Sequence, residues 1–211
     1  MKNTKEDIAK AFGQHAQLYV DKYFNVDYYE DALNLCYKHS NGEGIFLDIA
    51  CGPGNLTSHL LAHFPNATIL GIDSAEEMLT LAIKLNPKAR FKNISCTELL
   101  SIEQTFDGIL CGFVLPYLNK SETKKLIRDA SELLNVNGTL FLSGNLGNYK
   151  NSTAPGSSSG KGPKLYSFDY SLSFLAGELK KNGFNILSTF DYHREYEGFS
   201  AKEFAIVAIK A

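Results

Sequence analysis

The sequence predicts an α/β fold in which helices cover both faces of a mostly parallel sheet. Short apolar runs alternate with helical stretches from residue 44 to residue 183, a pattern typical of such sheets. The first run, 44–50, ends in a Cys-Gly-Pro-Gly turn. Two long apolar runs, 184–196 and 202–211, have no helix between them and should pair as an antiparallel hairpin. We therefore expect a Rossmann-like sheet of seven strands with a C-terminal antiparallel hairpin.

Local signals place the elements along the chain. Ser74 with Glu77, and Asn119 with Glu122, have the spacing of capping boxes and predict where two helices begin. Asn137-Gly138 marks the expected end of the second of these helices, whose apolar face runs to Leu134, and Asn182-Gly183 ends a later helix. Strands are expected at 44–50, 67–73, 89–95, 106–115, 138–144, 184–196 and 202–211, and further helices at 55–64 and around 172–179.

The chain is expected to form a single structural domain with an N-terminal addition. Residues 1–40 look helical, are rich in Tyr and Phe, and should form one or two helices laid over the sheet as a flap. Residues 41–211 should form the main domain. The stretch 151–162, NSTAPGSSSGKG, is too polar and glycine-rich to pack and is expected to be a mobile surface loop.

Composition limits the classes of function. The 211 residues are 44% hydrophobic and 21% charged, with a formal net charge of -2, which is ordinary for a globular protein. No run of Lys and Arg suggests nucleic-acid binding, and no apolar run is long enough to cross a membrane. The four cysteines lack a CxxC pair, so reduced thiols in a cytoplasm are expected and no metal site is predicted. His59 and His63 lack the Glu of a metalloprotease helix and are assigned to a solvated helix face.

The glycine turn and two carboxylates indicate the cofactor. Gly52 and Gly54 would allow a ligand to approach the backbone, although the third glycine of a dinucleotide fingerprint is replaced by Thr57. Asp73 ends the second strand, at the usual position for a carboxylate that binds ribose hydroxyls. Asp48 precedes the glycines and would repel the pyrophosphate of a nicotinamide cofactor. S-adenosylmethionine carries a sulfonium and an ammonium, which an acid favours.

These motifs resemble those of the class I S-adenosylmethionine-dependent methyltransferases. The resemblance covers roughly residues 40–211 and rests on LDIACGPG, LGIDSAEEML, FDGILCGFVLPYL and NVNGTLFLSG. Many relatives carry an Asp after the third strand that binds the adenine amino group, where this chain has Ser95. Whether the Ser95 hydroxyl or the Cys96 backbone replaces that contact stays open. The resemblance implies cofactor contacts at Tyr19, Asp48, Ala50, Gly52, Gly54, Asp73, Ser74, Met78, Ser95, Cys96, Cys111 and Phe113.

The implied function is in-line transfer of a methyl group from S-adenosylmethionine, most simply to a small-molecule acceptor. A general base is needed only if the acceptor is not already nucleophilic; the candidates are Tyr117, His193 and Tyr19. Asp107 begins a strand rather than ending it and is expected to be structural. Two alternatives remain: a module that binds the cofactor without catalysis, and a nicotinamide-dependent oxidoreductase. The acceptor, the atom methylated and the oligomeric state are left open.

Overall fold

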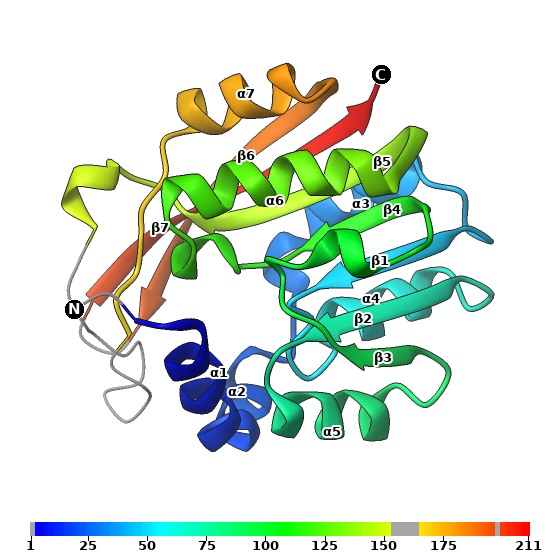
Figure 1. Cartoon of the computed structure of the whole chain (residues 1–211), viewed down its shortest axis with the longest axis horizontal. Coiled ribbons are helices and arrows are strands. Elements are labelled where there is room, and N and C mark those ends of the chain that lie inside the picture. The colour runs from blue at the N-terminus through cyan, green and yellow to red at the C-terminus, as the bar shows by residue number, and fades with distance from the viewer. Residues whose placement is uncertain (1–2, 153–164, 197–198) are drawn as a thin grey trace.

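The computed structural model describes residues 3–152, 165–196 and 199–211. It contains one seven-stranded sheet in the order β3-β2-β1-β4-β5-β7-β6, which confirms the predicted fold class (Figure 1). Nearly all of the predicted loop at 151–162 lies outside the described residues. The strands are β1 (Ile45–Ile49), β2 (Thr68–Asp73), β3 (Arg90–Asn93), β4 (Phe106–Cys111), β5 (Leu134–Asn145), β6 (Phe184–Tyr196) and β7 (Phe199–Lys210).

The first five strands in the chain run parallel, so their carboxyl ends meet along one edge of the sheet. The connection order reverses between β1 and β4, which lie side by side in the middle. Ligands bind at such a switch point in open α/β sheets. β7 runs antiparallel to both β5 and β6, so the predicted C-terminal hairpin is confirmed.

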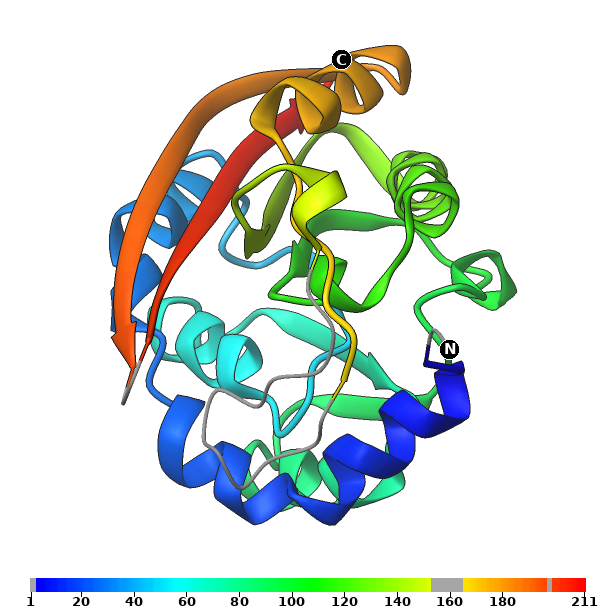
Figure 2. The same ribbon diagram turned by 90° about the vertical axis from the view of Figure 1, so that its left-hand side faces the viewer.

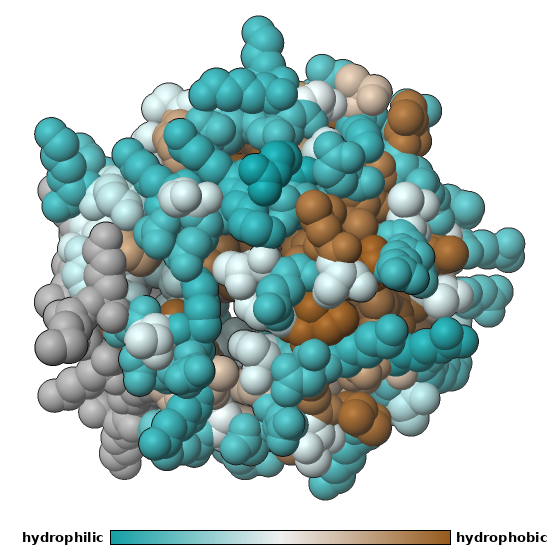
Figure 3. Space-filling view, viewed as in Figure 1, coloured by the Kyte–Doolittle hydropathy of each residue, from teal (hydrophilic) through white to brown (hydrophobic). Residues whose placement is uncertain are grey.

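Helices cover both faces because side chains alternate along each strand. Leu47 faces one apolar cluster with α6 and α7, whereas Phe46 faces the other with α3 and α4 (Figure 1). Polar side chains cover most of the face shown in Figure 3, with apolar groups between them. The helices are α1 (Lys5–Gln14), α2 (Ala16–Tyr23), α3 (Glu30–Lys38), α4 (Asn55–His63), α5 (Glu76–Leu85), α6 (Lys120–Leu133) and α7 (Leu172–Lys181), with short 3-10 turns η1 (Asp27–Tyr29), η2 (Leu99–Ser101), η3 (Leu115–Tyr117) and η4 (Tyr149–Asn151).

Of two predicted helix signals, one is half right and the other is wrong. Asn119 and Glu122 form the expected capping box of α6, but the helix ends at Leu133, and Leu134 already pairs with Phe106 in the sheet. The predicted box at Ser74 is wrong, because α5 begins after Ala75 without a side-chain cap. The Asp73 carboxylate instead accepts a hydrogen bond from the Ala75 N–H.

The N-terminal segment divides into two parts. Helix α3 packs on the sheet, with Ala32 and Leu33 fully buried in the core. Helices α1 and α2 instead contact α5 and lie across the carboxyl ends of the strands (Figure 2). The expectation of one or two helices over the sheet is therefore too simple. Within the described residues, no helix combines the length and apolar character that a membrane span requires.

Candidate functional site

The turn after β1 is built from unusual backbone conformations. Ala50, Gly52 and Gly54 all have positive φ, at 53°, 54° and 80°. A Cβ atom on Gly54 would lie 2.4 Å from Asn86 Nδ2, which donates a hydrogen bond to the Gly54 carbonyl. Gly54 therefore serves the contact with Asn86, and the structure places it outside both cavities described below. Its predicted cofactor contact is not supported.

Two cavities open at the carboxyl edge of the sheet beside this turn. The larger has a volume of about 670 Å³ and the smaller about 100 Å³. They adjoin, because Ala50 at the end of β1 and Phe113 after β4 line both. Phe113 also has positive φ, at 56°. Non-glycine residues in this region cost about 1–3 kcal/mol each and concentrate at functional sites. Four other residues are shared: Phe12, Tyr19, Gly112 and Tyr117.

The smaller cavity collects most of the predicted cofactor contacts. Its walls include Gly52, Asp73, Ser74, Met78, Ser95 and Cys96. The opposite wall is α1, through Lys5, Ile8, Ala9 and Phe12. Sequence reasoning did not assign α1 to the site. Thr4 and Asp7 form its capping box, and this spacing is a signal that could have located the helix.

Asp73 is held with both carboxylate oxygens oriented. One oxygen accepts from the Gly52 N–H at 2.9 Å and the other from the Ala75 N–H at 2.8 Å. Burial raises the pKa of this carboxyl above its usual value, although these hydrogen bonds oppose the shift. Each oxygen retains acceptor capacity for a further donor. The carboxylate can therefore bind two adjacent hydroxyl groups.

Asp48 is almost completely buried, at 1% exposure, and lines the larger cavity. One carboxylate oxygen accepts from the Thr57 hydroxyl at 2.7 Å and from the Thr57 N–H at 3.1 Å. Burial raises the pKa of Asp48 to about 7. Thr57 occupies the position of the missing third glycine, so that substitution orients the acid. A cation in the cavity would stabilise the charged form.

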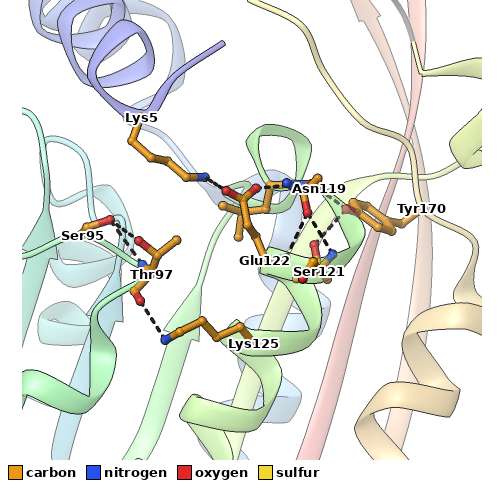
Figure 4. A network of polar contacts seen from close by, with 10 residues as sticks. Lys5, Ser95, Thr97, Asn119, Ser121, Glu122, Lys125 and Tyr170 are labelled. Carbon is orange, nitrogen blue, oxygen red and sulfur yellow. Dashed lines mark hydrogen bonds and ion pairs between the residues drawn. The ribbon is translucent and has the colours of Figure 1, made fainter. Parts of the chain in front are cut away.

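The loop after β3 presents two uncharged residues, Ser95 and Cys96, to the small cavity. The Ser95 hydroxyl lies 2.9 Å from Thr97 Oγ1 and accepts from the Thr97 N–H at 3.3 Å. Lys125 on α6 donates to the Thr97 carbonyl at 2.8 Å and holds the loop from outside (Figure 4). The polar groups of this loop therefore bind mainly one another.

Aromatic side chains from η1, α2 and the sheet wall the larger cavity. The Arg194 guanidinium on β6 lies over the rings of Tyr23 and Tyr28, at 5.4 and 5.1 Å from their centroids. Tyr29 donates a 2.6 Å hydrogen bond to Glu203 on β7. These contacts join the N-terminal segment to the C-terminal hairpin across the cavity.

Comparison with known proteins shows what the chain is similar to. A sequence model of the methyltransferase domain matches residues 46–138, which include the glycine turn and Asp73. Over this stretch the chain is similar to the class I S-adenosylmethionine-dependent methyltransferases. A malonyl-[acyl-carrier protein] O-methyltransferase of Bacillus anthracis is 33% identical over 46% of this chain and 36% of its own length. A trans-aconitate 2-methyltransferase of Variovorax paradoxus is 46% identical over 36% of this chain and 29% of its own.

The chain thus spans about a third of the length of these curated relatives. Solved structures agree in fold over more of the chain. An S-adenosylmethionine-dependent methyltransferase from Clostridium acetobutylicum has a TM-score of 0.70 at 20% identity. The match covers 95% of the present chain and 99% of the Clostridium chain. Magnesium protoporphyrin IX methyltransferase from Synechocystis, with bound SAH, has a TM-score of 0.65 at 18% identity. This match covers 98% of the present chain and 86% of the Synechocystis chain.

The residues fit the cofactor of this methyltransferase family. Asp73 can accept from two ribose hydroxyls, and Met78 lies in the same small cavity beside an apolar helix face. Asp48, in the adjoining cavity, can accept from an ammonium group. A pyrophosphate at the glycine turn would lie close to Asp48 and be repelled, so the nicotinamide alternative does not fit.

Two predicted site residues, Cys111 and His193, lie outside both cavities, whereas Asp107 was expected to be structural. Cys111 is fully buried in the core between β4 and α6 and lines neither cavity. His193 is exposed on β6, paired in register with Lys202, and also lies outside both cavities. Asp107 is structural as expected, since it accepts from Ile45 N–H and Asn135 Nδ2.

Tyr117 and Tyr19, two of the predicted site residues, line both cavities. The ring of Phe12 packs edge-on against each of them, at 5.1 and 6.0 Å between centroids. Burial raises the pKa of both phenols well above the usual value. At neutral pH their hydroxyls therefore carry protons, which disfavours a role as general bases.

Proposed function

We propose that the protein transfers a methyl group from S-adenosylmethionine to a small-molecule acceptor. The observation that carries this proposal is the division of two acids between adjoining cavities: Asp73 in the small one and Asp48 in the large one. When bound, the cofactor supplies an electrophilic methyl group on a positively charged sulfur. Ala50 and Phe113 line both cavities and would lie beside the reacting centre.

The chain's own residues would bind and orient the cofactor. We assign the ribose hydroxyls to Asp73, one face of the adenine to Met78, and the ammonium to Asp48, directly or through water. The turn at Gly52 allows close approach, because its φ of 54° suits a residue without Cβ. Tyr19 faces the junction of the cavities from α2.

We assign the role of flap to α1 and α2, since α3 packs in the core. The small cavity has a volume of about 100 Å³, below the roughly 300–1,000 Å³ typical of ligand sites. Helix α1 forms one of its walls, so outward movement of α1 would enlarge it. Closure of such a flap excludes water and fixes the reactants in line.

For the acceptor we propose a carboxylic acid, free or attached to a carrier. A guanidinium binds carboxylates well, and Arg194 lines the large cavity against two aromatic rings. A carboxylate is ionised at neutral pH and needs no general base, which agrees with the protonated tyrosines nearby. The names of two relatives, methyltransferases of malonyl-[acyl-carrier protein] and trans-aconitate, support this acceptor class.

The test has two stages. Calorimetry with S-adenosylhomocysteine should show binding at a single site, with no binding of NAD. Incubation with methyl-labelled S-adenosylmethionine should then label malonyl thioesters or tricarboxylic acids more than hydroxyl or amine acceptors of similar size. Binding without labelling of any acceptor would instead favour a non-catalytic module. Labelling confined to amines would contradict the carboxylate assignment.

A further inference from the structure

We propose that Lys5, the first residue of α1, donates a hydrogen bond to a ring nitrogen of the cofactor's adenine. The flap would then recognise the base directly, and recognition and closure would be one event. This inference rests on the proposed function, since it assumes that S-adenosylmethionine binds with its base in the small cavity.

The side of the small cavity beyond Asp73 has little charge with which to recognise a base. Ser95 and Cys96 line it from the loop after β3. The Ser95 hydroxyl is engaged with Thr97, and Thr97 is held by Lys125 (Figure 4). Ile8 and Ala9 across the cavity offer apolar contact alone. Lys5 is the charged side chain that α1 brings to this wall.

The ammonium of Lys5 is held in place by α6. Its Nζ lies 3.0 Å from Glu122 Oε1, while Glu122 Oε2 accepts from the Asn119 N–H at 2.8 Å (Figure 4). The capping box of α6 thus fixes the carboxylate that positions the lysine. An ammonium has three N–H donors, so the pairing leaves donors for another acceptor.

The Lys5–Glu122 ion pair acts electrostatically on the loop after β3, which contributes Ser95 and Cys96 to the small cavity. Burial raises the pKa of the Cys96 thiol to about 11, while the charge of Lys5 lowers it and that of Glu122 raises it. Both charges therefore act on the loop that lines the cavity. The two side chains are 35% and 29% exposed, and such partly exposed ion pairs contribute little to stability. The pair can accordingly share its ammonium with a ligand at small cost.

The backbone around Lys5 is anchored on both sides. Thr4 caps α1 with Asp7, and Asn3 exchanges two hydrogen bonds with the backbone of Tyr166, at 3.0 and 3.2 Å. Lys5 therefore reaches the small cavity when α1 is seated. Contact with the base would favour the seated position of α1 over the open one.

The experiment is a thermodynamic cycle that combines the variant Lys5→Met with modified forms of S-adenosylhomocysteine. Calorimetry would measure S-adenosylhomocysteine and its 1-deaza, 3-deaza and 7-deaza analogues, each of which replaces one ring acceptor by C–H. In the native protein one analogue should bind about tenfold more weakly. Lys5→Met should bind S-adenosylhomocysteine about tenfold more weakly than the native protein does, with no further loss for that analogue.

Two control variants test whether Lys5 contacts the adenine base or only holds α1 against α6 through Glu122. Lys10→Met removes the same charge from an exposed site on α1 and should leave every affinity unchanged. Glu122→Gln keeps a side chain suited to the capping box but breaks the ion pair, and should retain discrimination between analogues. If the losses of binding free energy caused by Lys5→Met and by each analogue simply add, Lys5 does not contact the base. If S-adenosylhomocysteine itself does not bind, the proposed function fails as well.

Discussion

The two cavities share a wall but are built from different parts of the chain. Apart from α1 and Tyr19, the small cavity is lined by Met78 of α5 and by the ends of β1, β2, β3 and β4 with the segments that follow them. All of these lie within the region that matches the methyltransferase domain. The large cavity is lined mainly by α2, η1, β5, the segment after it and the C-terminal hairpin, outside that region. In the function proposed above, most cofactor contacts would therefore come from the ends of the parallel strands, whereas acceptor binding would depend on segments far apart in sequence.

The two cavities also differ in the contacts that hold their polar side chains in place. Asp73 in the small cavity is oriented by backbone N–H groups, which substitution of neighbouring side chains leaves in place. In the large cavity Arg194 rests on tyrosine rings, and Tyr29 holds Glu203. Side-chain contacts change with single substitutions. The large cavity can accordingly diverge in specificity while the cofactor site is retained.

Removal of Asp73 should give the largest effect on the small cavity. We expect Asp73→Ala to weaken S-adenosylhomocysteine binding roughly 100-fold, because two charge-assisted hydrogen bonds to ribose are lost. Calorimetry measures the affinity. Asp107→Ala is the control: it removes a structural acid at the start of β4 and should lower the melting temperature without weakening binding. Unchanged affinity in a folded Asp73→Ala protein would refute the ribose assignment.

Gly54 tests whether the glycine turn serves the fold or the ligand. We expect Gly54→Ala to lower the free energy of unfolding by about 1–3 kcal/mol, because φ is 80° and the added Cβ meets Asn86. Gly177 in α7 has open space at its Cβ, so Gly177→Ala should stabilise by up to about 1 kcal/mol. Denaturant unfolding measures both. Equal stabilities for Gly54→Ala and the native protein would show that the turn is unstrained.

Asp48 links the cofactor site to pH. Because burial raises its pKa to about 7, the affinity for S-adenosylhomocysteine should rise as pH increases through 7 and level off above 8. Asp48→Asn should bind about tenfold more weakly at pH 8, since a charge-assisted contact is lost, and should abolish this slope. Calorimetry from pH 5.5 to 8.5 measures both effects. A slope that persists in the variant would assign the titration to another group.

The variant Asp48→Asn, which should weaken cofactor binding at pH 8, should instead raise the thermal stability of the protein at that pH. The folded pKa of Asp48 lies above the unfolded value of about 3.9, so ionisation of Asp48 destabilises the fold as pH rises from about 4 through about 7. Asp48→Asn should therefore melt at a higher temperature than the native protein at pH 8, with no such gain at pH 4. An Asn side chain can still accept from Thr57. A lower melting temperature at pH 8 would contradict this.

Substitution of Arg194 should have the smallest effect on the cofactor. We expect Arg194→Met to change the affinity for S-adenosylhomocysteine by less than about twofold, because Arg194 lies outside the small cavity that holds Asp73 and Met78 and is assigned to the acceptor. The variant should lose methylation of carboxylic acid acceptors, with Arg194→Lys intermediate. Label transfer from S-adenosylmethionine measures this loss. A large drop in cofactor affinity would show that Arg194 belongs to the cofactor site instead.

Sequence reasoning succeeded where the signal is local. Asp48 and Asp73 were found because each lies at or next to the end of a short apolar run, and parallel strands bring such ends to one edge. It failed where a competing contact decided the outcome. Ser74 does not cap α5, since Asp73 takes the Ala75 N–H, and Glu77 instead lies against Gly13 of α1.

Neighbouring positions on one strand also face opposite ways, which a motif does not show. Cys111 is in the fourth-strand motif, yet its side chain lies in the core with α6 and α7. Phe113, two residues on, reaches both cavities because its backbone has left the strand with positive φ. Cys111 accordingly lines neither cavity, whereas Phe113 lines both.

The sequence alone determined the sheet, the hairpin, the glycine turn and the two acids, because periodicity and turn chemistry act over a few residues. Tertiary structure alone decided that α1 walls the small cavity, that Lys5 meets Glu122 of α6, and that Arg194 rests on Tyr23 and Tyr28. The Lys5–Glu122 and Arg194–tyrosine contacts join residues more than 100 positions apart. Their geometry depends on how whole elements pack, which no local pattern specifies.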